Sequence, residues 1–195
     1  MKLIIVRHGE TGHNASGTVQ GHTQSKLNEK GLDQIRRVAE RLKTERIDAI
    51  FSSDLDRCSV TAREIAKFHS IPLIHTPELR ELSYGVWEGK PIAEFRSTRE
   101  NSGLSRHKFR PEGGENYEDA KIRIEHFLKK LETSHKGKTV LLVTHGALIR
   151  VFLSVLLKKP LDAFMDITIG NTAVSIVEIG DKDHKTHLIN DVGHL

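Results

Sequence analysis

The 195-residue sequence predicts an α/β fold, a three-layer α/β/α sandwich around a mostly parallel central sheet. Segments with strand character alternate with segments of helical periodicity, which is typical of strands joined by crossover helices. Leu3–Val6 and Val140–Val143 are continuous apolar runs, as expected of parallel strands buried on both faces. We expect one domain over residues 1–195, long enough to bury a core without disulfides or metal.

Six short segments have the composition of strands and lie between turn signals or helical segments. The predicted strands are Lys2–Val6, Asp48–Ser52, Pro72–His75, Thr139–Thr144, Ala173–Ile179 and His187–Asn190.

Four longer segments have helical periodicity, with apolar residues that recur three or four positions apart. The predicted helices lie within Leu27–Glu45, Arg57–Phe68, Tyr117–Leu131 and Ala147–Leu157, the last strongly apolar. The residues expected to face inward in the first and third helices are Leu32, Ile35, Val38, Ala39, Leu42, Ile122, Ile124, Phe127, Leu128 and Leu131.

The segment at about 87–116 differs from the rest because it is polar and has little strand pattern. We expect it to be an inserted lid with one short helix. It contains "SRHKFR", which places Arg106, His107, Lys108 and Arg110 close together, and we expect this stretch to face a crevice. Two interpretations stay open: a solvated basic loop, or side chains that contact a carboxylate or second phosphate of a substrate.

Composition excludes several classes of protein. The net charge is +4, but the 30 basic and 26 acidic residues are interspersed and aromatics are only 5%, so we expect no nucleic-acid partner. No apolar run approaches the ~20 residues needed to span a membrane. The one cysteine, Cys58, cannot form an intramolecular disulfide. We therefore expect a cytoplasmic protein.

Basic side chains follow three of the predicted strands. "LIIVRHGETGHN" ends its apolar run in Arg7 and His8, "TVLLVTHGALIRV" ends in His145, and "AIFSSDLDRCSVTA" places Arg57 in the first turn of a helix. Ligands of open α/β sheets bind beyond the carboxyl ends of the strands, where helix N-termini suit anions. A single His-Gly pair after a strand is commonly an ordinary turn, but this combination predicts an anion-binding crevice.

Motifs spread along nearly the whole chain identify a family. "RHGET" with Asn14, "SSDLDRCSVTA", "LRELSYGVWEG", "GGEN", "VTHG" and the closing "NDVGHL" occur in this order. Together they resemble the signature of the histidine phosphatase superfamily, in its phosphoglycerate mutase-like branch, and specifically a phosphatase-type member. The resemblance implies the phosphoglycerate mutase-like fold.

The resemblance also implies catalytic roles. His8 would attack phosphorus through Nε2 while an acceptor holds Nδ1–H, giving a phosphohistidine intermediate. Arg7 and Arg57 would clamp phosphoryl oxygens with their planar forks. His145, cationic when substrate is bound, would add charge stabilisation. Glu81 would be the general acid that protonates the leaving alkoxide and then activates water.

Further residues would bind the substrate, and no metal or other cofactor is expected because the basic groups can neutralise the phosphoryl charge. The stretch "HTQSKL" after Gly21 lacks the acidic and proline residues common in the family's substrate-side loop. This departure bears on the contacts with the substrate and not on the phosphoryl chemistry. The predicted substrate-binding residues are Thr11, Asn14, Gln20, Gly21 and Gly146.

The predicted function is hydrolysis of a phosphomonoester, with a small phosphorylated metabolite as the partner. The alternative is a 2,3-bisphosphoglycerate-dependent phosphoglycerate mutase. An aspartyl-phosphate phosphatase using "DLD" at Asp54–Asp56 would want the first aspartate directly at a strand end and would leave His8 unexplained. A non-catalytic phosphate-binding regulator would tolerate loss of His8 or Glu81, and both are present. The sequence indicates neither the physiological substrate nor the oligomeric state.

Overall fold

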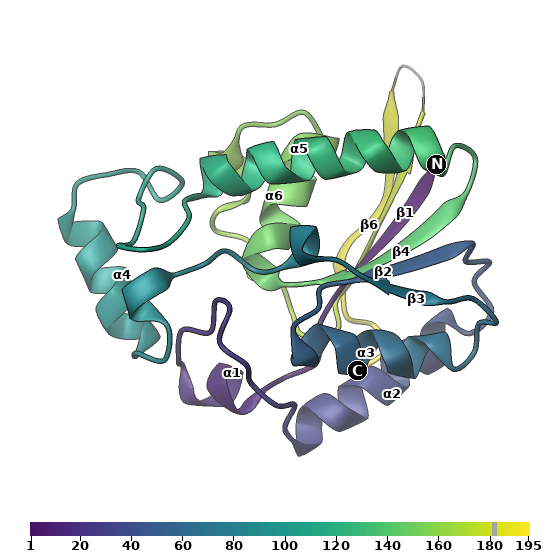
Figure 1. Ribbon diagram of the computed structural model, residues 1–195, viewed down its shortest axis with the longest axis horizontal. Coiled ribbons are helices and arrows are strands. Elements are labelled where there is room, and N and C mark those ends of the chain that lie inside the picture. Colours follow the sequence, from purple (N-terminus) through teal and green to yellow (C-terminus); the bar gives the residue numbers. More distant parts are fainter. Residues whose placement is uncertain (181–182) are drawn as a thin grey trace.

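A six-stranded sheet forms the middle layer of the molecule in the computed structural model, which describes residues 1–180 and 183–195 (Figure 1). The strand order is β3-β2-β4-β1-β5-β6. β1 pairs with β4, β4 with β2 and β2 with β3 in parallel, whereas β5 is antiparallel to both β1 and β6. The strands are β1 (Lys2–Arg7), β2 (Ala49–Ser52), β3 (Leu73–His75), β4 (Thr139–Thr144), β5 (Val174–Ile179) and β6 (His184–Asp191).

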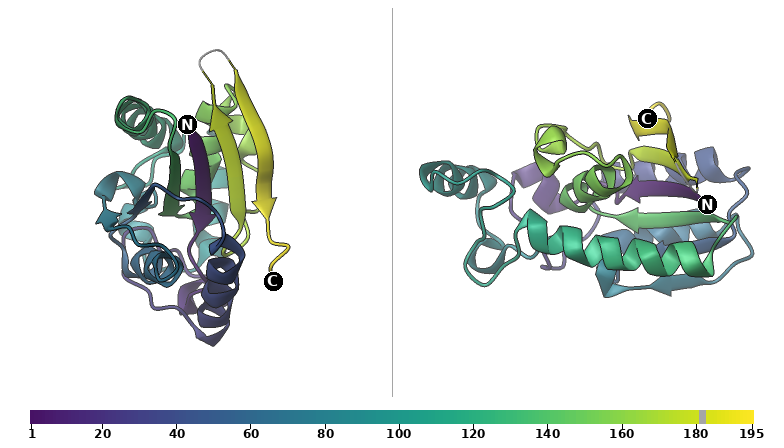
Figure 2. Two further views of the ribbon diagram at one scale, coloured as in Figure 1. Left: turned by 90° about the vertical axis from the view of Figure 1, so that its right-hand side faces the viewer. Right: turned by 90° about the horizontal axis from the view of Figure 1, so that it is seen from above.

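Helices cover both faces of the sheet, which confirms the predicted fold class (Figure 2). Alternate residues of β1 point to opposite faces, so that Leu3 and Ile5 join one hydrophobic cluster and Ile4 and Val6 the other. The helices of the first cluster are α5 (Tyr117–Ser134) and α6 (Gly146–Leu156), and those of the second are α2 (Glu29–Leu42) and α3 (Asp56–Ala66).

Two residues predicted to face inward are exposed, Leu32 by 39% and Ile122 by 56%. Ile122 lies two positions before the buried Ile124 and therefore points to the opposite side of α5. Leu32 is in the first turn of α2, where Gly31 takes the inward position. A Cβ on Gly31 would lie only 2.0 Å from the carbonyl oxygen of Glu10, so the chain after β1 is packed against this end of α2.

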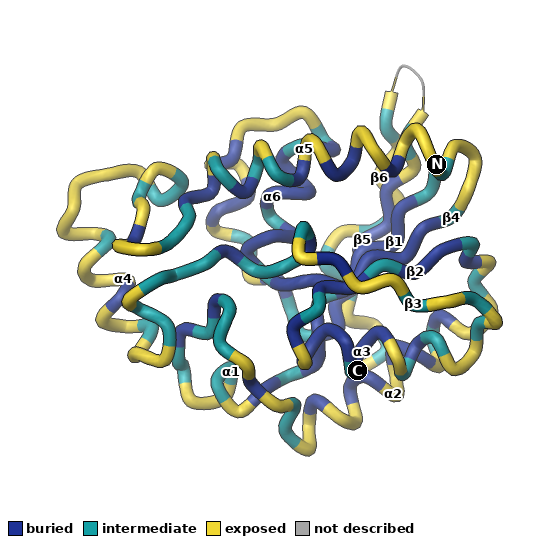
Figure 3. Tube along the Cα trace, viewed as in Figure 1, coloured by how far each residue is buried: buried dark blue, intermediate teal, exposed yellow. Residues whose placement is uncertain are grey.

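The segment predicted to be an insertion, residues 87–116 and called the insertion below, lies at one end of the molecule, beyond the carboxyl ends of the parallel strands (Figure 1). Its regular elements are the end of a 3-10 turn (Gly85–Trp87) and α4 (Ile92–Asn101). Phe95 is the one buried residue of α4, with its ring against those of Tyr84, Trp87 and Phe109. Most of the rest of this segment is exposed (Figure 3).

Three further short elements complete the described part of the chain. α1 (Gly12–Ser16) is a single turn of helix that the sequence did not predict, and 3-10 turns span Pro77–Leu79 and Leu161–Phe164. Within the described residues, no helix combines the length and the apolar character that crossing a membrane requires.

Candidate active site

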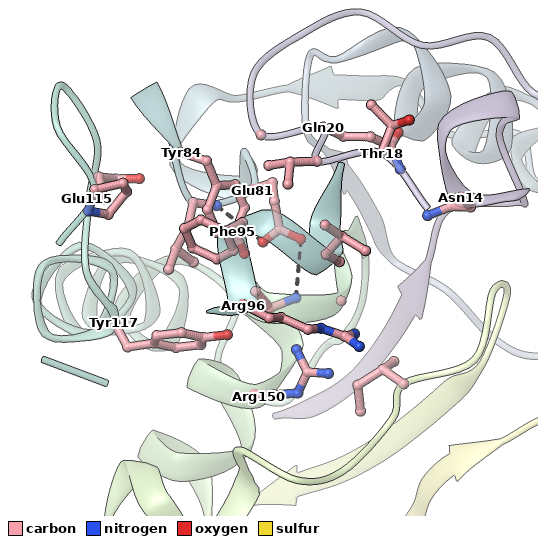
Figure 4. A pocket seen from close by; sticks show the side chains of 18 of the residues that line it. Asn14, Thr18, Gln20, Glu81, Tyr84, Phe95, Arg96, Glu115, Tyr117 and Arg150 are labelled. Carbon is pink, nitrogen blue, oxygen red and sulfur yellow. Dashed lines mark hydrogen bonds between the residues drawn. The ribbon is translucent and has the colours of Figure 1, made fainter. Parts of the chain in front are cut away.

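A cavity of about 240 Å³ lies beyond the carboxyl ends of β1 and β4, between the sheet and the insertion (Figure 4). Residues that follow the strands line this cavity, as the strand-end motifs predicted. Residues of the insertion line it as well. Most of the predicted site residues lie on its wall, whereas Thr11 and His145 do not. Those on the wall are Arg7, His8, Asn14, Gln20, Gly21, Arg57, Glu81 and Gly146.

His8 follows β1 directly and is only 2% exposed. Its Nδ1 lies 2.7 Å from the carbonyl oxygen of Gly9. Since a carbonyl can only accept, Nδ1 carries the hydrogen and Nε2 keeps its lone pair. Burial, followed by the positive charges of Arg57 and Arg7, holds the pKa of His8 well below its usual value. The imidazole is therefore neutral and presents a nucleophilic nitrogen.

The loop after His8 is fixed by α2. A Cβ on Gly9 would lie 2.7 Å from a side-chain carbon of Ile35 and 2.8 Å from the carbonyl oxygen of Gly31, so only glycine fits without a shift. Glu10 pairs with Lys30 at 2.9 Å and its backbone N–H donates to the side chain of Gln34. These contacts hold the backbone that orients the His8 ring.

Arg57 lies in the first turn of α3 and is almost fully buried. Its guanidinium donates to the carbonyl oxygens of Gly21 (2.6 Å) and Thr23 (2.9 Å), and its Nε donates to Nδ1 of His145 (3.2 Å). The two carbonyls position the loop that contains Gln20 and Gly21. Gly21 has φ +52, and a Cβ there would meet the Glu88 carboxylate, so glycine is required.

His145 lies behind the wall of the cavity, fully buried, with its ring centroid 5.2 Å from that of His8. Because Nδ1 accepts from Arg57, Nε2 carries the hydrogen, and it lies 2.9 Å from Oγ of Ser53. Burial and the charge of Arg57 hold the pKa of His145 well below its usual value. In the free protein this histidine is therefore neutral, and it supports Arg57 and packs beside His8.

Arg7 contributes a donor that lacks a partner. One terminal nitrogen donates to the carbonyl oxygen of Ile169 at 2.6 Å, but the buried Nε–H has no hydrogen-bond acceptor among the described residues. Gly146 lies beside it, and a Cβ at that position would be 3.3 Å from Nε. Burial is the main cause that lowers the pKa of Arg7 to about 10, so the group stays charged at neutral pH. A buried charged donor without a partner indicates an anion site.

Glu81 reaches the cavity from the segment after the 3-10 turn Pro77–Leu79. Its Oε1 accepts from the backbone N–H groups of Leu82 and Leu148, and its Oε2 accepts from that of Ala147, all at 3.1 Å. Two of these donors belong to the first turn of α6, where the helix dipole favours a carboxylate. Oε2 makes only one of these bonds, so it keeps more free acceptor capacity than Oε1.

Asn14 and Gln20 are oriented by Thr11. Oδ1 of Asn14 accepts from the backbone N–H of Thr11 (3.1 Å), from its hydroxyl (3.0 Å) and from Nδ2 of Asn171 (3.3 Å). With its oxygen so occupied, Asn14 turns Nδ2 toward the cavity. Oε1 of Gln20 also lies 3.0 Å from the Thr11 hydroxyl. Thr11 itself is fully buried as the N-cap of α1, so the structure does not place it against a substrate as the sequence predicted.

The outer wall carries three arginines that the sequence did not single out, Arg96, Arg99 and Arg150, beside the predicted Arg106. Aromatic residues of the insertion line the same wall. Of the three, only Arg150 left a signal in the sequence, as the single charged residue of the apolar helix α6. The two arginines of α4 left none, because their position on the cavity wall depends on tertiary packing.

The basic stretch of the insertion faces the cavity only through Arg106. Arg110 pairs with Asp119 at 2.5 Å and His107 lies 2.6 Å from Asp162, whereas Lys108 is exposed. The prediction that this stretch faces the crevice is therefore wrong for three of its four basic residues, because acidic residues on neighbouring elements draw two of them away.

Other predicted chemistries lack the geometry they need. Asp54 pairs with Arg80, and neither Asp54 nor Asp56 lines the cavity, so the "DLD" alternative has no support. Cys58 is buried, and its burial raises the pKa of the thiol well above its usual value. Across residues 1–180 and 183–195, no cluster of three or more His, Cys, Asp or Glu side chains is arranged to hold a metal ion.

Sequence relatives agree with this site. Residues 3–192 match the histidine phosphatase superfamily (branch 1). The chain is 35% identical to the metal-independent phosphoserine phosphatase of Arabidopsis thaliana, covering 100% of this chain and 83% of that protein. It is 34% identical to a probable phosphoglycerate mutase of Enterobacter sp. (strain 638), covering 100% of this chain and 95% of that one.

Solved structures give the same result. Bacillus stearothermophilus YhfR superposes with a TM-score of 0.90 at 30% identity, covering 99% of this chain and 98% of that chain. A mutant phosphoserine phosphatase from Entamoeba histolytica in complex with phosphoserine superposes with a TM-score of 0.88 at 28% identity, covering 100% and 98%. These similarities support a phosphoric monoester hydrolase and favour a phosphatase over a mutase. The chain belongs to the histidine phosphatase superfamily, in its branch 1.

Proposed function

We propose that this protein hydrolyses a small phosphorylated metabolite through a phosphohistidine formed on His8. The observation that carries the proposal is the pairing of a neutral His8, whose Nε2 keeps its lone pair, with the unpartnered buried Nε of Arg7 in one cavity. A nucleophile beside a charged donor of this kind suits attack on a phosphoryl group, because negative charge on the phosphoryl oxygens is neutralised as the new bond forms.

In the first step, Nε2 of His8 attacks phosphorus and the bond to the substrate oxygen breaks. Glu81, protonated at Oε2, gives its proton to the leaving alkoxide. In the second step, Glu81 takes a proton from water, the water oxygen attacks phosphorus, and the bond to His8 breaks to release phosphate. Arg7, Arg57 and Asn14 donate hydrogen bonds to the phosphoryl oxygens in both steps.

The remaining predicted residues hold this arrangement in place. In the free protein we assign His145 to orienting Arg57, whose Nε donates to its neutral ring. Once an anion is bound, protonation of Nδ1 would exchange this bond for a positive charge. We assign Thr11 to fixing Asn14 and Gln20. Gln20, Gly21 and Gly146 then shape the wall on which the substrate lies. In this proposal the chain is one domain, residues 87–116 act as its lid, and the protein works in the cytoplasm.

Metal and cofactor dependence gives the first prediction. We expect phosphate release from a panel of small phosphomonoesters to continue unchanged in excess EDTA and without 2,3-bisphosphoglycerate, because the cationic side chains already neutralise the phosphoryl group. Vanadate, which adopts a trigonal-bipyramidal geometry, should inhibit. Activity that returns only on adding Mg²⁺ would contradict the metal-independent mechanism. Isomerisation of 3-phosphoglycerate that depends on the bisphosphate would favour the mutase instead.

The second prediction concerns Glu81→Gln. This variant cannot donate the proton that an alkoxide needs, so we expect kcat for alkyl phosphates to fall by roughly 10²-fold or more. The rate with p-nitrophenyl phosphate should fall much less, because nitrophenolate leaves with little proton assistance. In the glutamine side chain an NH₂ group replaces one oxygen and faces the backbone N–H of Ala147 or Leu148. One hydrogen bond to the first turn of α6 is therefore lost, and we expect Tm to fall by roughly 2–4 °C.

A matched control separates the chemistry from the loss of stability. Glu78→Gln changes a carboxylate on the same segment that does not line the cavity, and it should leave both substrates unaffected. Equal losses for alkyl and nitrophenyl phosphates in Glu81→Gln would mean that Glu81 only caps α6 or that water attack limits both reactions.

A further inference from the structure

The segment that carries Glu81 has no regular structure, yet its backbone carbonyls are almost all held. Residues 80–84 lie between two 3-10 turns and belong to no helix or strand. The carbonyls of residues 78–81 and 83 nevertheless accept hydrogen bonds. The donors come from α5, from β4, from the loop at residues 20–23 and from the "GGEN" stretch at residues 113–116. Tertiary contacts therefore set the position of this segment.

Arg123 contacts the segment at two points. The side chain extends from α5, and its Nη1 donates to the carbonyl oxygens of Glu78 (2.7 Å) and Arg80 (3.0 Å). Its Nη2 lies 3.1 and 3.3 Å from the two carboxylate oxygens of Glu115. One planar guanidinium therefore joins three groups in fixed directions, which a flexible ammonium could not do.

Glu115, from the "GGEN" motif, holds the segment on the other side of Glu81. Its Oε2 accepts from the backbone N–H of Ser83 (3.0 Å), and its own backbone N–H donates to the Ser83 carbonyl (2.8 Å). Gly114 permits this approach, because a Cβ there would lie 2.6 Å from the Ser83 carbonyl oxygen. Arg123 and Glu115 together therefore fix the chain both before and after Glu81.

Only one member of this pair lies on the cavity wall. Glu115 lines the cavity (Figure 4), whereas Arg123 does not. The two side chains are 26% and 19% exposed, so their ion pair is screened by water less than a pair at the surface. Because Arg123 lies outside the cavity, any effect of this residue on the reaction has to pass through the residues that it holds.

We propose that Arg123 and Glu115 are positioning residues that place the Glu81 carboxyl for proton transfer to the leaving group. The inference rests on the proposed function, in which Glu81 is the general acid. A displacement of about 1 Å can lower the rate of a reaction by roughly 10²-fold, even when its cause is far from the reacting atoms. Loss of Arg123 frees the carbonyls of residues 78 and 80 and therefore lets the Glu81 segment shift.

The test compares two substrates that differ in how much they need the acid. Arg123→Ala should lower kcat for glycerol 3-phosphate by roughly tenfold or more, because a misplaced Glu81 protonates the alkoxide poorly. The rate with p-nitrophenyl phosphate should fall much less, since nitrophenolate leaves with little proton assistance. Vanadate should inhibit the variant as strongly as the wild-type protein, because the proposed phosphoryl contacts come from other elements. A purely structural role would slow both substrates alike.

Combining Arg123→Ala with Glu81→Gln shows whether Arg123 acts through Glu81. Residues that serve one step as a unit give losses that are not additive. Glu81→Gln already removes the transferable proton, so adding Arg123→Ala should leave the ratio of the glycerol 3-phosphate rate to the p-nitrophenyl phosphate rate unchanged. A further fall of this ratio would mean that Arg123 acts on the reaction independently of Glu81, and the inference would be wrong.

Two more variants guard against a loss of folding, and Tm is measured for each. Arg123→Lys keeps the positive charge beside Glu115 but reaches fewer acceptors, so its rate ratio should lie between those of the wild type and Arg123→Ala. This variant carries the test if Arg123→Ala does not fold. Lys121→Ala is the matched control: it breaks a pair with Glu125 (3.6 Å) on the same helix, outside the cavity, and should leave the ratio unchanged.

The outcomes distinguish this inference from the function on which it rests. If Glu81→Gln discriminates between the two substrates but neither Arg123 variant does, the positioning role is wrong and the phosphatase mechanism stands. If Lys121→Ala changes the ratio as much as Arg123→Ala, the effect belongs to α5 in general, and the positioning role is again wrong. If Glu81→Gln slows both substrates alike, the acid role in the proposed function fails, and the inference fails with it.

Discussion

Replacing His8 by alanine should lower kcat for every phosphomonoester by roughly 10³-fold or more, because the variant has no atom to accept the phosphoryl group. Arg7 and Arg57 would remain, so substrate and vanadate should still bind. The wild-type protein, mixed with labelled substrate and quenched without acid, should yield a labelled protein whose bond is stable in base and breaks in acid. His8→Ala should yield none.

The buried position of His8 makes a stability control necessary. The variant removes a ring that packs near His145, and we expect a lower Tm with a cooperative transition. His126→Ala, at an exposed position of α5, is the matched control and should keep full activity. Normal turnover by a folded His8→Ala protein, or label found on an aspartate, would overturn the mechanism.

Arg57→Ala should be nearly as damaging, with kcat/KM lower by roughly 10²–10³-fold for all substrates alike. The guanidinium is proposed to contact the phosphoryl group and also holds the carbonyls of Gly21 and Thr23. Arg57→Lys should recover little, because an ammonium cannot bind two carbonyls and a phosphoryl oxygen with the fixed fork of arginine. Both variants should bind vanadate weakly.

The measurement that distinguishes this role is the comparison of substrates. Loss of a phosphoryl contact should affect alkyl phosphates and p-nitrophenyl phosphate equally. Arg63→Lys, on the same helix but outside the cavity, controls for charge and helix position and should be silent. A loss in Arg57→Lys confined to one class of substrate would show that Arg57 acts on the substrate loop and not on the phosphoryl group.

The part of the cavity around His8 and Arg57 could be predicted because these residues follow strands. His8 and Arg57 each come just after a short apolar run, and parallel strands bring their carboxyl ends to one edge of the sheet. Glu81 was identified only through the resemblance of its motif. Its bonds to α6, which make it both a cap and a proposed acid, follow from tertiary packing that no local pattern encodes.

The outer wall of the cavity could not be predicted for a related reason. Arg96 and Arg150 are 54 positions apart in the sequence and line one cavity only through tertiary packing. The sequence instead drew attention to the densest basic stretch, of which Lys108 and Arg110 point elsewhere. In the same way, Thr11 looked like a ligand contact because it follows His8 closely, yet the turn of α1 buries it as a cap.

The part of the cavity around His8 and Arg57 and the part lined by α4 also differ in how readily their residues can be substituted. His8 and Arg57 are buried and share bonds with several elements, so a substitution there damages folding and chemistry together. Arg96 is exposed on α4, which is anchored by the single buried side chain of Phe95, so its neighbours can be replaced at little cost to stability. New substrate preferences can therefore arise, in evolution or by directed mutagenesis, through a few changes in α4 while the reaction itself is inherited intact. The same scaffold is a practical starting point for libraries that randomise only the outward positions of that helix.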